Sequence, residues 1–128
     1  MTENLTRFYF EKEDHLFNLE DDKYSYLAKG SATNSQGMEI DLYFKVEESR
    51  IIDAKYNVSG CPVLIAISAF YIENVIGKKL NHCHDFNAIG IYESIEIPNH
   101  KKDRMILLED AVYNCLGQIG SRWIFYEY

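Results

Sequence analysis

The sequence has little of what marks a secreted or membrane-bound chain. It holds three cysteines in 128 residues, an odd number that does not suit a disulfide framework. Two prolines and seven glycines are too few for a disordered or collagen-like chain. No basic segment followed by an apolar one opens the sequence, so we expect no signal peptide. The longest apolar run, residues 61–72, is too short to cross a bilayer.

Positive charge is also scarce, with 13 basic against 20 acidic residues and a net charge of −7. This balance argues against nucleic acid as a partner and against binding to an anionic membrane surface. Because 47% of the residues are apolar, the chain can bury a core of its own. We therefore expect a single cytoplasmic domain over residues 1–128, in which residues 1–22 form an N-terminal arm or a short helix.

Alternation of apolar and polar residues predicts β-strands in the first half of the chain. Residues 38–46 alternate strictly, and residues 52–58 do so again after a polar connection. The two runs predict a hairpin whose even-numbered residues lie on the buried face. Residues 23–29 could add a third strand, joined to the hairpin through a loop rich in glycine, serine and asparagine. We predict an antiparallel meander.

After Gly60 the spacing of apolar residues changes from the two-residue repeat of a strand to that of a helix. Pro62 suits the first turn of a helix, where a missing N–H costs nothing, and Gly77 is a natural end. Residues 63–76 are apolar on most sides, which predicts a largely buried helix across the inner face of the sheet.

Further helices are predicted in the second half of the chain. Residues 103–116 have apolar positions at helical spacing, with Asp103 as the N-cap and Gly117 as the end. Residues 81–97 are ambiguous and could hold a short helix that ends near Gly90. Strands first and helices afterwards predict the α+β class, with a three-stranded antiparallel sheet packed against helices.

Cys61 is the residue with the clearest chemical signal. It follows a predicted strand and immediately precedes the proline that opens a helix, so its sulfur would lie among the unpaired N–H groups of a helix N-terminus. Such a position lowers the pKa of a thiol and favours the thiolate, which binds metals or attacks sulfur. The alternative is a small apolar residue that fills a corner between strand and helix. Local physics leaves both interpretations open.

The other cysteines and histidines carry a weaker signal. His82-Cys83-His84 has the composition of a metal-binding tract, but three adjacent residues cannot easily converge on one ion, so a polar loop is favoured. Cys115 lies on the apolar side of the last predicted helix and is expected in the core, whereas His100 is expected at the surface. We find no glycine-rich phosphate loop, no GxSxG elbow and no HExxH pair.

Five segments follow one another along the chain: residues 53–62 (DAKYNVSGCP), 66–69 (AISA), 77–78 (GK), 97–101 (IPNHK) and 108–111 (LEDA). Together they resemble the IscU/NifU-type iron–sulfur cluster assembly scaffolds, over about residues 24–116. The resemblance implies the IscU/NifU N-terminal-like fold and a role in iron–sulfur cluster assembly, as a scaffold and not as an enzyme.

The ligand residues of that family are mostly replaced here. Family members hold iron or a [2Fe–2S] cluster, with zinc as a substitute in purified protein, through three cysteines, an aspartate and often a histidine. Of these, the resemblance leaves Cys61. The first cysteine falls where Asn34 and Gln36 are the nearest polar candidates, and the histidine–cysteine pair corresponds to Asp103 and Arg104. The resemblance thus implies Asp103 as a possible second ligand and Arg104 as a possible anion-stabilising group.

The resemblance also implies partners. Family scaffolds work with a cysteine desulfurase, and they engage an Hsp70-type chaperone through a Leu-Pro-Pro-Val-Lys segment. Here Ile97, Pro98 and Lys101 keep the aliphatic residue, the first proline and the lysine of that segment, and so become candidate chaperone contacts. A homodimer is a further possibility.

Three hypotheses follow. The first is a scaffold-like protein that binds iron or a cluster weakly, or accepts sulfur on Cys61 from a cysteine desulfurase. The second is a metal-free interaction module for a desulfurase or an Hsp70-type chaperone. The third, a cysteine enzyme with Cys61 as nucleophile, requires an aligned base, for which Asp103 and His100 are the candidates.

Overall fold

The computed structural model describes Leu16, residues 28–80 and residues 88–126, with side chains up to residue 119. Within these residues it has three strands, three α-helices and a short 3₁₀ helix: β1 (Ala28–Thr33), β2 (Glu39–Glu47), β3 (Arg50–Ser59), α3 (Pro62–Val75), α4 (Ala88–Ser94), the 3₁₀ helix (Asn99–Lys101) and α5 (Asp103–Tyr126). The predicted arm at residues 1–22, apart from Leu16, and the tract at residues 82–84 lie outside the described residues.

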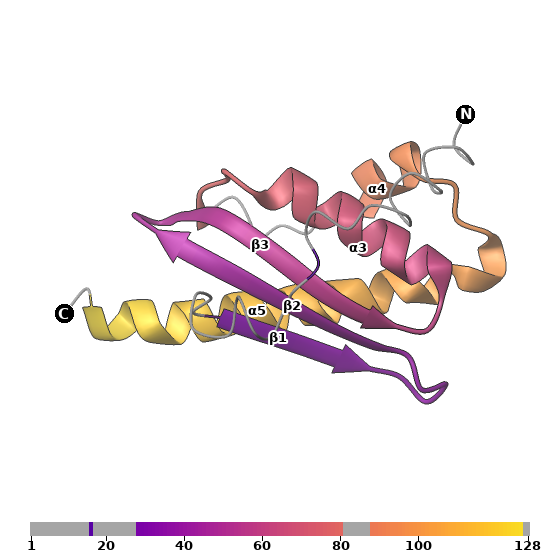
Figure 1. The fold of residues 1–128 in the computed structure, drawn as a ribbon, viewed down its shortest axis with the longest axis horizontal. Helices are drawn as coiled ribbons and strands as arrows, with labels where there is room; N and C mark the ends of the chain where they lie inside the picture. Colours follow the sequence, from indigo (N-terminus) through magenta and orange to yellow (C-terminus); the bar gives the residue numbers. More distant parts are fainter. Residues whose placement is uncertain (1–15, 17–27, 81–87, 127–128) are drawn as a thin grey trace.

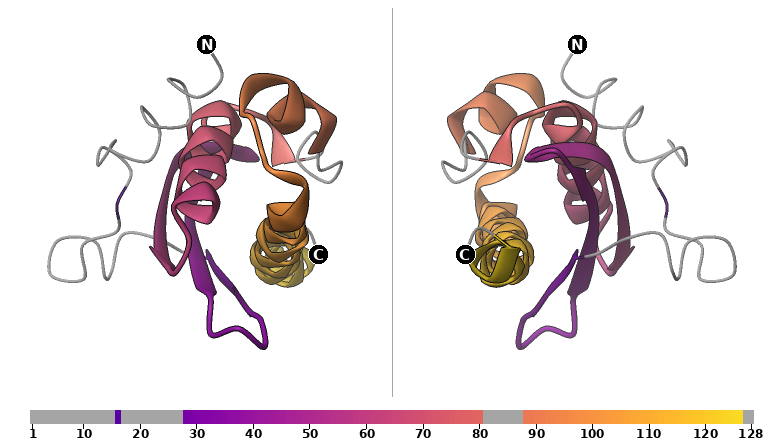
Figure 2. Two further views of the ribbon diagram at one scale, coloured as in Figure 1. Left: turned by 90° about the vertical axis from the view of Figure 1, so that its right-hand side faces the viewer. Right: turned by 90° about the vertical axis from the view of Figure 1, so that its left-hand side faces the viewer.

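The strands form an antiparallel sheet in the order β1-β2-β3 (Figure 1), which confirms the predicted meander. Both long helices cover the same face of this sheet (Figure 2): α3 packs on β3, and α5 packs on β1 and β2. The helices also touch one another, and α4 lies against α3. The predicted α+β class, with helices on a three-stranded sheet, is confirmed. Among the described residues, no helix has the length and apolar character needed to cross a membrane.

The backbone of α5 lies directly on β1 at Gly30. A Cβ atom at this glycine would be 2.3 Å from the carbonyl oxygen of Ala111 and 2.3 Å from the amide nitrogen of Cys115. Cys115 is fully buried and donates to the carbonyl oxygen of Leu42 at 3.8 Å, as expected for a core residue. Burial raises the pKa of its thiol to about 12, so this cysteine stays protonated at neutral pH.

Side chains of α5 also bond the outer edge of β1. The Asn114 amide donates to the carbonyl oxygen of Ser31 at 2.8 Å, and the N–H of Lys29 donates to the Gln118 side-chain oxygen at 2.9 Å. These bonds satisfy backbone groups that β2 cannot reach, because β2 pairs with the other edge of β1.

Two predictions about the strands are wrong. The first strand continues to residue 33 and does not end at 29, so it includes small residues that the pattern placed in a loop, whereas residues 23–27 of the prediction lie outside the described residues. The small residues form a strand because α5 packs closely on them. In β3 a bulge leaves Ile52 without a partner, since Lys45 pairs with Asp53 and Val46 pairs with Ile51. Ile51 is therefore buried, whereas Ile52, which was predicted to face the core, is 41% exposed.

The helix from Pro62 is confirmed almost residue for residue, but the later helices differ from prediction. Helix α5 continues through Gly117 because Leu116 and Ile119 are buried in the core, which outweighs the roughly 1 kcal/mol cost of a helical glycine. Helix α4 contains Gly90 and does not end there. Asp103 is the first residue inside α5, one position later than an N-cap.

Replacing Gly30 by alanine should lower the free energy of unfolding by about 3 kcal/mol, because the new methyl group would overlap two backbone atoms of α5. The matched control is Gly117→Ala in α5, where no atom lies within 4 Å of the added Cβ. This change should stabilise the protein by up to about 1 kcal/mol. Urea unfolding measures both values. A Gly30→Ala protein as stable as the wild type would contradict the close packing of α5 on β1.

Candidate functional site

Three segments that are far apart in the sequence meet at one end of the sheet. Strands β1 and β3 both run antiparallel to β2, so both finish at the same end of the sheet. There β1 leads into a hairpin and β3 leads into α3. Helix α5 begins at this end too (Figure 1). The site is therefore built from the hairpin at residues 34–38, the corner at residues 60–61 and residues 101–104, where the 3₁₀ helix leads into α5.

Cys61 is the N-cap residue of α3, with Pro62 in the first turn, as predicted. The preceding Gly60 has φ +132°, a conformation that favours glycine, and it sets the sharp turn from strand to helix. The residue is only 8% exposed. Its sulfur does not cap the helix with a full side-chain hydrogen bond, but it lies where the backbone N–H groups of Val63 and Leu64 act on it.

The environment of Cys61 favours the thiolate. Burial, which is the largest single influence, raises the pKa of the thiol. The two N–H groups at the start of α3 lower it, and so do a hydrogen bond from Arg104 and the positive charge of Lys101. The lowering effects together exceed that of burial, so the pKa lies below that of an ordinary thiol.

Arg104 reaches Cys61 from the first turn of α5. Its side chain is 11% exposed, and Nη1 is 2.5 Å from Oδ1 of Asp103. The bond with Asp103 raises the pKa of the guanidinium most, burial lowers it, and the contact with Cys61 raises it again. The Nε atom is buried and has no hydrogen-bond partner among the described residues. Arg104 is thus a nearly buried cation shared between a carboxylate and a thiol.

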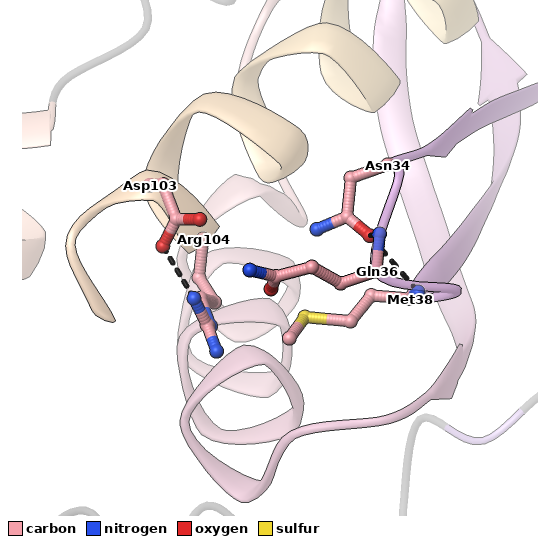
Figure 3. A network of polar contacts seen from close by, with 5 residues as sticks. All are labelled: Asn34, Gln36, Met38, Asp103 and Arg104. Atoms are coloured by element: carbon pink, nitrogen blue, oxygen red, sulfur yellow. Dashed lines mark hydrogen bonds and ion pairs between the residues drawn. The ribbon is translucent and has the colours of Figure 1, made fainter. Parts of the chain in front are cut away.

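The hairpin supplies the other side of the site. Asn34 orders it, because its side-chain oxygen accepts hydrogen bonds from the N–H groups of Gln36 and Met38, each at 3.0 Å. The side chains of Gln36 and Met38 then extend toward Arg104 (Figure 3). Met38 also packs on the corner, since a Cβ at Gly60 would be 2.9 Å from its Cγ.

The structure thus gathers most of the predicted site residues. Cys61 and Arg104 are in contact, Asp103 is bonded to Arg104, and Gln36 points toward Arg104. The Asn34 oxygen is instead used by its own loop. That these residues act in function stays a prediction.

Sequence reasoning missed two contributors to this site. Met38 was assigned only to the apolar face of a strand, although it closes the site from the hairpin. Lys101 was considered only as a chaperone contact, although its charge acts on Cys61. Its position three residues before Arg104, on the adjoining 3₁₀ helix, was the available signal.

The predicted chaperone segment is only partly accessible. Ile97 is buried, Lys101 is half-buried, and Pro98 is exposed. His100 is exposed, as expected. The chaperone contacts remain a prediction, and of the three residues only Pro98 is in the exposed class.

The donor atoms of the described residues do not fit a metal cluster held by one copy of the protein. Within residues 28–80 and 88–126, no group of three or more histidine, cysteine, aspartate or glutamate residues could hold a metal ion. Cys61 offers one sulfur, the Asp103 carboxylate is paired with Arg104, and the guanidinium lies beside the thiol. Several thiolates are normally needed, because each of them both binds iron and offsets its charge.

Comparisons with known proteins agree with the fold. The family model of the NifU-like N terminal domain matches residues 9–122. Over 87 residues, covering 67% of this chain, the sequence is 38% identical to the iron–sulfur cluster assembly scaffold protein IscU of Haemophilus influenzae and 33% identical to that of Escherichia coli. These matches cover 69% and 68% of the two relatives. The crystal structure of a nitrogen-fixing NifU-like protein (N-terminal) from Brucella abortus superposes with a TM-score of 0.71 at 17% identity, over 91% of this chain and 92% of that one.

The contact between Arg104 and Cys61 predicts a measurable change in reactivity. Alkylation of Cys61 by iodoacetamide follows the thiolate, so its rise with pH reports the pKa of the thiol. Because Arg104 lowers this pKa, Arg104→Gln should move the rise to higher pH. Peptide mass spectrometry follows the modification at Cys61 itself. Lys78→Gln, which removes an exposed cation beyond the other end of α3, should leave the profile unchanged. Equal profiles for Arg104→Gln and the wild type would contradict the contact.

Proposed function

Because the chain belongs to the family of NifU-like N-terminal domains, and relatives at 33–38% identity are named iron–sulfur cluster assembly scaffold proteins, we propose that it acts in this assembly as a sulfur acceptor. Cys61 is the accepting residue, and a cysteine desulfurase is the donor. The protein is a carrier in this proposal and not an enzyme, and it acts in the cytoplasm, where thiols stay reduced.

The contact between Cys61 and Arg104 carries the proposal. Sulfur transfer needs a thiolate as the attacking group, and it leaves a persulfide that is again an anion. A nearly buried guanidinium beside the sulfur stabilises both species, and the N–H groups at the start of α3 act in the same direction.

The transfer balances without any other reactant. The Cys61 thiolate attacks the terminal sulfur of a persulfide on the desulfurase, and a new sulfur–sulfur bond forms on Cys61. The bond between that sulfur and the desulfurase cysteine breaks, and the desulfurase thiolate leaves with the electron pair. Met38 and Gln36 extend toward Arg104 from the hairpin, so their side chains would lie beside the transferred sulfur.

The same contact weighs against iron or a cluster as cargo of a single chain. Each positive charge of an iron ion about 4 Å from the guanidinium would be repelled by roughly 4 kcal/mol at an effective dielectric constant of about 20. The attraction of one thiolate would have to overcome this, because Asp103 is already paired with Arg104. Weak iron binding, or a cluster shared between two copies, is therefore the less favoured form of the proposal.

A metal-free interaction module is the second candidate, and exposed Pro98 is the observation that favours it. The turn at residues 98–100 is exposed beside the site, so a desulfurase or an Hsp70-type chaperone could contact it without reaching Cys61. In that case the fold is used for docking and the thiol is dispensable.

The first experiment is anaerobic incubation with a cysteine desulfurase and cysteine, followed by intact mass spectrometry. We expect the wild type to gain one sulfur atom that a thiol reductant removes. Cys61→Ser should gain none, whereas Cys83→Ser, which keeps Cys61, should be loaded like the wild type. Arg104→Gln should be loaded more slowly by about tenfold, the size of one charge-assisted hydrogen bond.

Iron added to the same mixture separates the alternatives. A visible cluster chromophore that Cys61→Ser abolishes would favour a scaffold shared between copies over a carrier. Absence of both sulfur and colour, with desulfurase or chaperone retained on the immobilised protein, would favour the interaction module and overturn the sulfur-acceptor proposal.

A further inference from the structure

We infer that the Cys61 site also takes sulfur directly from a small anionic sulfane donor of the thiosulfate class, with Arg104 and Lys101 binding the oxyanion end. The inference rests on the proposed function, since it names a second substrate for the same accepting cysteine. It adds a small-molecule activity that needs no protein donor.

The charges around the sulfur suit an anion. The Arg104 guanidinium lies beside the thiol at the start of α5, the positive charge of Lys101 acts on the thiol from the 3₁₀ helix, and the N-terminus of α3 presents its N–H groups. Asp103 is the acidic residue paired within this group, and its side chain is 51% exposed, so water weakens its opposing charge.

One donor in the site has no acceptor within the part of the chain that the structure describes. Nε of Arg104 is buried and unpartnered, and an unsatisfied buried N–H group costs about 1–3 kcal/mol. Nη1 of the same guanidinium is bonded to Asp103, which holds the group in place beside Cys61. An oxygen or sulfur atom of a ligand beside Cys61 would supply the missing acceptor. Gln36, whose amide extends toward Arg104 from the hairpin, adds an uncharged polar group on the opposite side.

The accessibility of Cys61 suits a small donor. Only 8% of the residue is exposed, and Met38 packs on the adjoining Gly60. A protein donor must insert the segment that carries its persulfide into this site. An ion the size of thiosulfate can enter without any such segment.

The reaction balances within the two reactants. The Cys61 thiolate attacks the outer sulfur of thiosulfate, a sulfur–sulfur bond forms on Cys61, and the sulfur–sulfur bond of thiosulfate breaks. Sulfite leaves with the electron pair of that bond, and the protein keeps a persulfide anion. Total charge is conserved, and no external oxidant or reductant takes part.

The test is incubation of the full chain with thiosulfate alone, followed by intact mass and by an assay for sulfite. We expect one added sulfur atom, one sulfite released per protein, and no addition to Cys61→Ser. Iodoacetamide, which is neutral and consumes the same thiolate, serves as the reference reaction for every variant.

The ratio of the thiosulfate rate to the iodoacetamide rate removes the effect of the thiol pKa. Arg104→Gln should lower this ratio by about tenfold, and Lys101→Gln should lower it by a smaller factor. Lys78→Gln, the same change at an exposed position beyond the other end of α3, should leave it unchanged. An unchanged ratio in Arg104→Gln would overturn the inference, because the cation would then not bind the donor.

Comparison with the desulfurase separates the two proposals. Loading by the desulfurase without loading by thiosulfate would overturn this inference and leave the proposed function intact. Loading by thiosulfate alone would support this inference and count against a protein donor. Loading by neither would overturn both.

Discussion

The close contact of α5 with β1 at Gly30 is the constraint on which the site depends. The helix backbone touches the strand there without an intervening side chain, so its depth and rotation above the sheet are set within a narrow range. Arg104 precedes Ala111 by seven residues, or about two turns, and so lies on the same side of the helix. A residue with a side chain at position 30 would lift α5 and withdraw the guanidinium from Cys61.

Cys61 and Arg104 stabilise one another's charged forms. The guanidinium lowers the pKa of the thiol, and the thiol contributes to raising the pKa of the guanidinium. Neither group would be well placed alone, because a charge that is nearly removed from water is costly without a partner. In a ligand set of several thiolates the groups that face Cys61 would be negatively charged, whereas here the facing group, Arg104, is positively charged. A positively charged site suits anions, and for this reason the proposed cargo is sulfur and not iron.

Local sequence signals were sufficient for part of this architecture. Pro62 and Gly77 correctly marked the two ends of a helix and so placed Cys61 at its start. The preferences of proline and glycine at helix ends act within one turn, and a local sequence signal is enough to detect them. Strict alternation in β2 was equally reliable. The position of β1 could not be predicted in the same way, since Gly30 belongs to a strand only because α5 packs on it. The bulge at Ile52 likewise depends on pairing with β2, which no single-strand pattern reveals.

Most members of the site were predictable from the sequence, but Met38, the role of Lys101 and the contacts within the site were not. The resemblance to a scaffold family placed Arg104 near Cys61, whereas the inward direction of Met38 depends on a hairpin that Asn34 orders. The length of α5 beyond Gly117 depends on burial of Leu116 and Ile119, which is a property of the assembled core.

The bonds from Asn114 and Gln118 to the outer edge of β1 affect how copies of this protein can meet. An open strand edge is a template on which a neighbouring chain can add its own strand, and sheets joined in this way grow into ribbons. On the β1 side two of the groups needed for such growth are already occupied by the protein's own helix. A neighbouring copy could therefore not add a strand along this edge without first breaking both of these bonds.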